Sequence, residues 1–404
     1  MSGGVIFLCC QPHNTFGGTC GSNFLTTFER RYIMKFTIER GALLKSLGHV
    51  QSVVERRNTI PILSNVRLDA GEGCLSLNAT DMDLDIIDKG DAVVSQPGAT
   101  TARAQTLYEI VRKLPEGSQV EFDSDGEGQL LLRSGRSRFT LTCLPTDDFP
   151  VMSGGEMGHT FSLHASEIRS LIDRTRFAIS TEETRYYLNG IYLHAAERNG
   201  SQVLRAVATD GHRLASVEGP LPNTADGMPG VILPRKTVGE LRKLIDETVD
   251  EIVVELSETK IRFTFDSVIL TSKLIDGTFP DYERVIPVGN DKEMVVNCKS
   301  FAEAVDRVSA ISTEKSRAIK LSLTSGTLVL SASSPESGTA TEELEVSYQG
   351  EAVDIGFNSS YLLDITRQIE GDNARFTLAD AASPTILSET DDNSALYVLM
   401  PMRV

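Results

Sequence analysis

A short strand followed by an amphipathic helix occurs three times along this chain, and this repeat constrains the fold more than any other feature of the sequence. The three copies begin at Phe36, Phe161 and Met294, so they are separated by 125 and 133 residues. In each copy, alternating apolar residues give way to apolar residues at i, i+3 and i+4, the spacing of one helical face. Intervals of this length match whole domains rather than the short units of a solenoid.

Each copy also contains a second helix, which divides every repeat into two strand–helix–strands halves. The six predicted helices span 40–57, 105–114, 165–178, 235–246, 299–311 and 359–369. Alternating runs such as 251–256 and 261–265 predict strands after them. Antiparallel sheets with a few helices on one face make an α+β architecture. We therefore predict three domains of one design, at 34–155, 156–288 and 289–404.

Residues 1–33 do not share this periodicity, and we predict that they form a disordered N-terminal extension. No basic residue precedes their short apolar run, so a signal peptide is not indicated. Outside this segment, Cys74, Cys143 and Cys298 lie isolated among apolar or small residues, which is typical of reduced cysteines in a cytosolic protein. No apolar stretch is long enough to span a bilayer. We predict a cytoplasmic protein without membrane association.

Charge is distributed unevenly along the chain. The formal net charge of −17 argues against binding to nucleic acid, yet the predicted helices together contain 16 basic and 9 acidic residues. One interpretation is that Lys and Arg occupy ordinary solvated helix faces. The other is that the helices share a basic surface that holds a polyanion by its backbone, without reading bases. On that interpretation, helix charge alone selects Arg112, Lys113, Arg235 and Lys236 as DNA contacts.

Few residues carry a pattern typical of catalysis. Asp81, Asp83 and Asp85 are predicted to alternate on one strand face, where carboxylates can bind Mg²⁺, although a solvated strand face is the favoured interpretation. Asp210 and His212 have the spacing of an acid–base pair, as in a metal-dependent hydrolase. The sequence Ala-Thr-Asp before this pair also ends at Asp81, where no His follows. A repeated turn therefore explains the motif better than an active site.

The chain ends on an unusual apolar run, Tyr397 to Val404, with two methionines around a proline. Methionine is common at surfaces that accept several partners. The run is either the last strand of a buried sheet or part of an exposed docking groove, and the sequence pattern leaves both alternatives open.

An ordered set of motifs resembles the bacterial DNA polymerase III beta subunit family, the sliding clamps. The motifs are Ser134 to Phe139, Leu144-Pro145 with Asp148 to Pro150, Arg185 to Gly190, Ala208 to Leu214, Leu233 to Lys236, Thr271 to Leu274 with Asp276 to Tyr282, and Tyr397 to Val404. The resemblance runs from Met34 to the C-terminus and leaves residues 1–33 without a counterpart.

The resemblance implies a non-catalytic processivity factor without a cofactor. Each chain would form half of a ring, as a head-to-tail homodimer, with helices lining the hole and antiparallel sheets outside. The ring would encircle double-stranded DNA without sequence specificity. It would tether the polymerase III alpha subunit, other polymerases, the clamp loader and repair proteins through short peptide motifs. A metal-dependent hydrolase that uses Asp210 and His212, and a peptide-binding scaffold without DNA, are the alternative functions.

The resemblance also assigns residues to each role. Arg136 and Arg138 would face Glu336 and Glu342 across the dimer interface, although Gly338 and Thr339 stand where the family often has acids. Arg57, Tyr186 and Tyr187 would touch DNA. The peptide groove would comprise Leu188, Thr209, Gly211, His212, Arg213, Leu214, Pro280, Arg284, Val285, Asn358, Tyr361, Val398, Leu399, Met400, Pro401, Met402, Arg403 and Val404.

Overall fold

The computed structural model of the protein describes residues 33–55, 59–126, 128–152, 155–245, 250–312 and 317–403. The predictions for Arg57, for Val404 and for the extension up to residue 32 concern residues outside these ranges.

Within the described ranges, one order of elements occurs three times. Repeat 1 contains β1 (Met34–Glu39), α1 (Arg40–Gln51), β2 (Asn65–Gly71), β3 (Cys74–Thr80), β4 (Leu84–Asp91), β5 (Val93–Gln96), β6 (Gly98–Arg103), α2 (Ala104–Lys113), β7 (Gln119–Ser124), β8 (Gln129–Ser134) and β9 (Ser137–Thr142).

Repeat 2 contains β10 (His159–His164), α3 (Ala165–Asp173), β11 (Gly190–Arg198), β12 (Ser201–Thr209), β13 (Arg213–Pro220), β14 (Val231–Pro234), α4 (Arg235–Ile245), β15 (Glu251–Leu256), β16 (Lys260–Phe265) and β17 (Val268–Lys273). Repeat 3 contains β18 (Lys292–Asn297), α5 (Cys298–Ser309), β19 (Ala318–Thr324), β20 (Thr327–Ser334), β21 (Gly338–Glu345), β22 (Ser347–Tyr348), β23 (Val353–Asn358), α6 (Ser359–Thr366), β24 (Asn373–Leu378), β25 (Thr385–Glu389) and β26 (Ala395–Leu399).

Local capping sets where the helices begin. Glu39 accepts a hydrogen bond from Ala42 N at 2.9 Å before α1, and Asn297 and Asn358 cap α5 and α6 in the same way. All six helices begin within one residue of their predicted starts. Their ends differ more from the prediction: α1 ends at Gln51 instead of residue 57, and α3 ends at Asp173 instead of residue 178.

These earlier ends reduce the positive charge that the helices carry. The six helices hold 11 basic and 7 acidic residues, so the predicted surplus of seven positive charges was too large. The surplus is confined to α1, α2 and α4, which together hold eight basic residues against two acidic ones.

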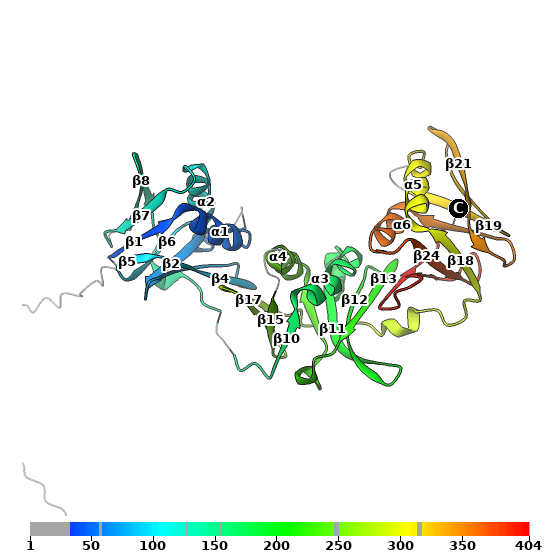
Figure 1. Ribbon diagram of the computed structural model, residues 1–404, viewed down its shortest axis with the longest axis horizontal. Coiled ribbons are helices and arrows are strands. Elements are labelled where there is room, and N and C mark those ends of the chain that lie inside the picture. Colours follow the sequence, from blue (N-terminus) through cyan, green and yellow to red (C-terminus); the bar gives the residue numbers. More distant parts are fainter. Residues whose placement is uncertain are drawn as a thin grey trace, which may run out of the picture. The chain divides into compact units, whose positions relative to one another are not determined.

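The helices pack in pairs, α1 with α2, α3 with α4 and α5 with α6, and the members of each pair belong to one repeat (Figure 1). Each helix buries its apolar face, including Leu43, Leu107, Leu171, Leu241 and Phe301. None of the described helices is long and apolar enough to cross a membrane.

The described strands form four antiparallel sheets, and two of these sheets continue from one repeat into the next. Their strand orders are β5-β1-β7-β8-β9, β10-β15-β16-β17-β4-β3-β2-β6, β14-β11-β12-β13-β26-β25-β24-β18-β22 and β21-β20-β19-β23. Strand β4 of repeat 1 pairs with β17 of repeat 2, which we call the first junction. Strand β13 of repeat 2 pairs with β26 of repeat 3, which we call the second junction.

Both junctions follow one rule. The third strand after the first helix of one repeat pairs with the last strand of the following repeat. Strands β21 and β9 hold these two positions in repeats 3 and 1. Within the part of the chain that the structure describes, each is the edge strand of its sheet.

Candidate functional site

The Thr-Asp motif is a turn that occurs at both junctions with the same hydrogen bonds. Thr80 Oγ1 donates to Leu84 O at 2.9 Å, and Thr209 Oγ1 donates to Arg213 O at 2.7 Å. Asp81 Oδ1 accepts from the N–H groups two and three residues later, at 2.9 and 2.7 Å. Asp210 Oδ1 does the same, at 2.9 and 3.0 Å. The two aspartates therefore shape the chain locally.

The residue after each aspartate has a positive φ, 79° at Met82 and 89° at Gly211. Glycine adopts this conformation freely, whereas a methionine is strained there. In repeat 3 the turn is weaker. Ser334 Oγ accepts from the N–H groups of Glu336 and Ser337 at 3.4 and 3.3 Å, and Pro335 stands where the aspartate would be.

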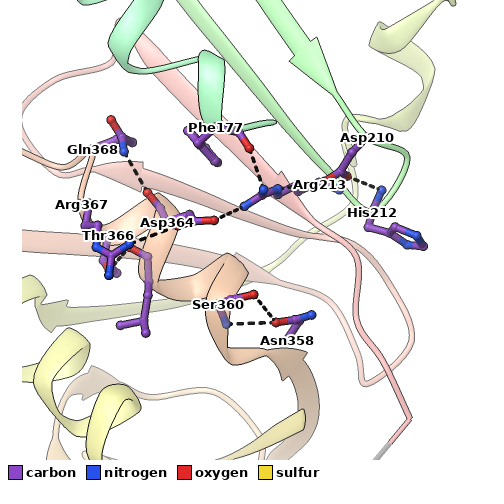
Figure 2. Close-up of polar contacts among 11 residues, drawn as sticks. Phe177, Asp210, His212, Arg213, Asn358, Ser360, Asp364, Thr366, Arg367 and Gln368 are labelled. Carbon is purple, nitrogen blue, oxygen red and sulfur yellow. Dashed lines mark hydrogen bonds and ion pairs between the residues drawn. The ribbon is translucent and has the colours of Figure 1, made fainter. Parts of the chain in front are cut away.

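Asp210 and His212 are not arranged as an acid–base pair. The Asp210 carboxylate accepts from the backbone N–H of His212, and Figure 2 shows the His212 ring pointing away from it. The ring stacks instead on Tyr361, with centroids 6.5 Å apart. Asp210 Oδ2 pairs with Arg213 Nε at 3.0 Å.

Arg213 joins repeat 2 to repeat 3. Its guanidinium donates to Asp364 Oδ2 and to the carbonyl oxygen of Phe177, both at 2.6 Å, and also binds Asp210 (Figure 2). It lies over the rings of Phe177 and Tyr361, 5.1 and 4.3 Å from their centroids. The side chain is only 10% exposed. Arg213 was predicted only as a groove residue, and the structure gives it this joining role in addition.

A second arginine joins the same two repeats. Arg174 Nη1 pairs with Asp392 at 2.9 Å and donates to Ser394 Oγ at 3.0 Å, and Nε lies 3.4 Å from the Tyr397 hydroxyl. Burial alone would lower the pKa of Arg174, but its hydrogen bond to Tyr397 and its contact with Asp392 raise that pKa. Sequence reasoning missed Arg174 and Asp364, because their partners are distant in the chain.

Three predicted groove residues share a small apolar cluster that is separate from the main core. Leu188, Leu214 and Val398 pack with Val207, Ile232, Phe279 and Tyr282. The three groove residues are buried, and Leu214 and Val398 lie directly opposite each other at the second junction. Of the other apolar residues predicted for the groove, Val285 and Met400 are half exposed. We call Leu188, Leu214 and Val398 the apolar floor of the predicted groove.

The first part of the C-terminal run is a buried strand, as one of the two alternatives predicted, and the docking groove of the other alternative stays a prediction. Tyr397, Val398 and Leu399 are buried in β26, which lies between β13 and β25. The chain then emerges, and Met400 is 42% exposed. Backbone hydrogen bonds hold this end in place, from Met400 N to His212 O and from Met402 N to Gly356 O, each 2.9 Å long.

The remaining residues predicted for the groove differ in their exposure to solvent. Thr209 is buried in the turn, and Asn358 caps α6 beside Tyr361. The residues exposed to solvent are Gly211, His212, Pro280, Arg284 and Arg403, and Pro401 and Met402 are half-buried.

The four DNA contacts predicted from helix charge differ in their surroundings. Lys236 Nζ pairs with Asp81 and Glu55 and donates to Val53 O at 3.1 Å, so it joins repeat 2 to repeat 1. Burial alone would lower the pKa of Lys236, but Asp81 and then Glu55 raise it. Arg235 and Tyr186 are exposed and line one hollow with Lys236, and Tyr187 packs edge-on against Tyr186. Arg112 and Lys113 are exposed and both pair with Glu109.

The predicted dimer residues lie on two edge strands. Arg138 is on β9 and Arg136 is in the turn before it, and both are exposed. Glu342 on β21 binds Arg307 of α5 through both oxygens, at 2.5 and 3.1 Å, and this pairing lowers the Glu342 pKa. Glu336 is in the turn before β21.

The predicted alternation of Asp81, Asp83 and Asp85 on one strand face was wrong. Asp81 and Asp83 lie in the turn, where they pair with Lys236 and Lys273, and only Asp85 is in β4. Among the described residues, no group of three or more His, Cys, Asp or Glu is placed to hold a metal ion. Cys74, Cys143 and Cys298 are free thiols, as predicted.

Comparisons with known proteins agree along the chain. Family models for the N-terminal, central and C-terminal domains of the DNA polymerase III beta subunit match residues 34–153, 162–281 and 283–403. A Caulobacter vibrioides protein named beta sliding clamp is 54% identical over 372 residues, which cover 92% of this chain and 100% of that protein.

Solved structures give the same result. The C. crescentus beta sliding clamp, with PEG bound to a putative beta-motif tethering region, has a TM-score of 0.91 and 54% identity, over 93% of this chain and 100% of that one. The Bartonella birtlesii clamp bound to griselimycin has a TM-score of 0.90 and 51% identity, over 92% of this chain and 100% of that one.

Proposed function

Because this chain belongs to the DNA polymerase III beta subunit family, it is a sliding clamp that encircles DNA as a non-catalytic processivity factor, and we propose that it does so as a head-to-tail homodimer that binds partner peptides at the second junction. The apolar floor formed by Leu188, Leu214 and Val398 is the observation that carries the peptide proposal. The hydrolase alternative lacks support, because the Asp210 carboxylate serves its own turn and Arg213.

The junction rule supports the homodimer. Two of three possible junctions are made within one chain, and β21 and β9 are the strands left over. A second copy of the chain completes the pattern if its β9 pairs with β21, and its own β21 accepts the first copy's β9. Two-fold pairing of this kind closes the assembly and leaves neither strand at a free edge.

The same rule gives a register for the missing junction. Leu84, four residues after Thr80, pairs with Ser272, four residues after the start of β17. The matching residues are Gly338, four after Ser334, and Leu141, four after the start of β9. Ala340 then lies opposite Phe139 of the partner subunit. Both residues are half-buried and pack against the core of their own repeat, so pairing buries them further.

Extending this register by one residue pair, past Glu342, places Glu343 opposite Arg136 of the partner subunit. Glu343 is exposed, whereas Glu342 is already bound to Arg307. The proposed interface therefore uses Glu343 in addition to the acids expected from the resemblance. Arg136→Glu should shift the dimer toward monomer in sedimentation at micromolar concentration, and combining it with Glu343→Arg should restore the dimer. A double variant as monomeric as Arg136→Glu would contradict this register.

DNA is held by topology rather than by strong contacts. The basic residues of α1, α2 and α4 provide phosphate contacts that salt screens, which allows the ring to move along the duplex. We propose Arg235, Tyr186, Arg112 and Lys113 as contacts, because all four are exposed. A clamp loaded on circular DNA should remain bound and should dissociate when that DNA is linearised. Equal loss from both forms would contradict encirclement.

The groove is proposed to bind short peptides reversibly. Burying two or three side chains of Leu or Phe size gains about 3–9 kcal/mol before ordering costs, which leaves an affinity near micromolar. The probe is a fluorescently labelled peptide with two leucines and one phenylalanine. Leu214→Asp should abolish peptide binding. Glu370→Ala, at an exposed residue that follows α6 in the chain, should leave it unchanged. Binding unaffected by Leu214→Asp would place the groove elsewhere.

The finer assignments follow from this role. Domain boundaries at 34–155, 156–288 and 289–404 are proposed, each enclosing one repeat. The partners are the polymerase III alpha subunit, the clamp loader, other polymerases and repair proteins, and the site of action is the cytoplasm. The Bartonella clamp was crystallised bound to griselimycin, and we propose that this chain binds that compound too.

A further inference from the structure

The two junctions within the chain have equivalent backbones but opposite chemistry. At the second junction, a row across four strands reads Thr209, Leu214, Val398 and Ile386, each residue paired with the next. At the first junction, the row at the same register reads Thr80, Asp85, Thr271 and Arg262. Two of the three floor residues, Leu214 and Val398, thus have Asp85 and Thr271 as their counterparts.

Equivalence of the two rows rests on the turn that precedes them. Asp85 is five residues after Thr80, and Leu214 is five residues after Thr209, and the two turns have the same hydrogen bonds. A buried leucine also stands two residues before the first strand of each row's sheet segment, Leu63 before β2 and Leu188 before β11. The two junctions therefore match in backbone along this row and in the leucine before it, and they differ in the side chains of the row.

Asp85 lowers the stability of the fold at this position. It is 5% exposed, and its Oδ1 has no hydrogen-bond partner within the described ranges. The Oδ1 atom of Asn78, on the same sheet face, also has none there. A buried carboxylate oxygen without a partner destabilises a fold. Burial raises the pKa of Asp85 to about 6. A leucine, as in the other row, would avoid this cost.

We propose that Asp85, with Thr271, is a specificity determinant that prevents apolar peptide side chains from docking at the first junction. A leucine or phenylalanine placed there would meet a buried carboxylate and a hydroxyl that binds Arg262, instead of the apolar side chains that favour its burial, which opposes binding. Partners are thereby confined to one site on each chain. This inference rests on the proposed groove at the second junction.

The test converts the first junction into a copy of the second. The full chain carrying Asp85→Leu and Thr271→Val is titrated with the labelled peptide described above, and bound peptide per chain is measured. The wild type should bind one peptide and the double variant two. With Leu214→Asp added, the double variant should still bind one, because only its new site remains. One peptide bound by the double variant, and none after Leu214→Asp is added, would overturn the proposal.

Two controls separate specificity from a general change in the sheet. Asp69→Leu adds an apolar residue to the same face on β2, outside the row, and should leave one peptide bound. A second peptide bound by Asp69→Leu would mean that any apolar patch suffices, and would overturn the proposal. Asp85→Leu alone, a smaller change, should fold and gain a weaker second site. A wild-type chain that binds no peptide would instead overturn the groove, and this inference with it.

Discussion

The guanidinium of Arg213 lies 4.3 Å from the centre of the Tyr361 ring, so a residue of the second repeat packs on the first turn of helix α6 in the third. The same guanidinium binds Asp364, one turn further along that helix. Tyr361 also stacks on His212. Two residues of the proposed groove, His212 and Tyr361, are therefore in contact with the side chain that joins the two repeats, and a change at Arg213 should affect both the junction and the proposed groove.

Removing Arg213 should destabilise the second junction. Arg213→Ala leaves Asp364 and Asp210 without their main partner, and a broken pair at this depth costs about 2–4 kcal/mol. Arg367→Ala is the matched control, since Arg367 pairs with the same Asp364 at 3.3 Å but is 69% exposed, and should cost less than about 1 kcal/mol. Urea unfolding measures both. Equal losses in the two variants would contradict the joining role of Arg213.

Stability should depend on pH through Asp85. Its pKa rises from the ordinary 3.8 to about 6 in the folded chain because the carboxyl group is buried. The folded state therefore binds the proton more tightly than the unfolded state, and stability falls as pH rises from about 4 to about 7. Asp85→Asn should remove this loss and exceed the wild type by about 3 kcal/mol above pH 7. Unfolding midpoints at pH 4.5 and 8 test this, and a difference independent of pH would contradict it.

Substitutions of the neighbouring residues Lys236 and Arg235 should have different effects, the first on stability and the second on DNA binding. Lys236→Met removes the contacts with Asp81, Glu55 and Val53 and should cost about 1–2 kcal/mol, since the ammonium is partly solvated. Arg235→Ala should leave stability unchanged and reduce the salt dependence of DNA binding by about one phosphate contact. Thermal unfolding and DNA titrations at several salt concentrations measure these effects. A destabilised Arg235→Ala variant would contradict the assignment.

Truncation after Leu399 should separate docking from folding. Strand β26 ends at Leu399. For the described residues up to Arg403, the deletion of Met400 to Val404 removes two backbone bonds, from Met400 N to His212 O and from Met402 N to Gly356 O. We expect a loss of about 1–3 kcal/mol, an intact dimer and no binding of the labelled peptide. Sedimentation and anisotropy test the two parts. Unfolding of repeat 3 would show that the tail belongs to the core.

The starts of the helices could be predicted from the sequence, whereas several ends could not. Caps such as Glu39 and Asn297 act on the next few residues, so they are visible locally. The predicted continuation of α3 to residue 178 fails because the helix ends at Asp173, Thr175 Oγ1 donates back to Leu171 O at 2.5 Å, and the chain continues as a 3-10 turn from Arg176 to Ala178. The contacts that Arg174 makes at this helix end could not be predicted either, because Asp392 and Tyr397 are more than 200 residues away.

The residues of the proposed groove were predicted from family motifs, whereas the strand pairing that brings them together was not predicted. Leu214 and Val398 belong to motifs that could be recognised in the sequence, but their pairing depends on two strands from different repeats. The burial of Asp85 was missed for the same reason. A strand with charged residues predicts a solvated face, but Asp85 is buried in β4, which pairs with β17 of the next repeat.

The sheets that cross from one repeat to the next have a practical consequence. The sequence repeats in units of one domain, but the hydrogen bonds of β4 with β17 and of β13 with β26 connect strands of different repeats. A fragment cut to contain one repeat would lose a neighbour along a whole strand and present that bare edge to other molecules. Such fragments should aggregate on expression, so dissection of this protein is better done by point substitution than by cloning single repeats.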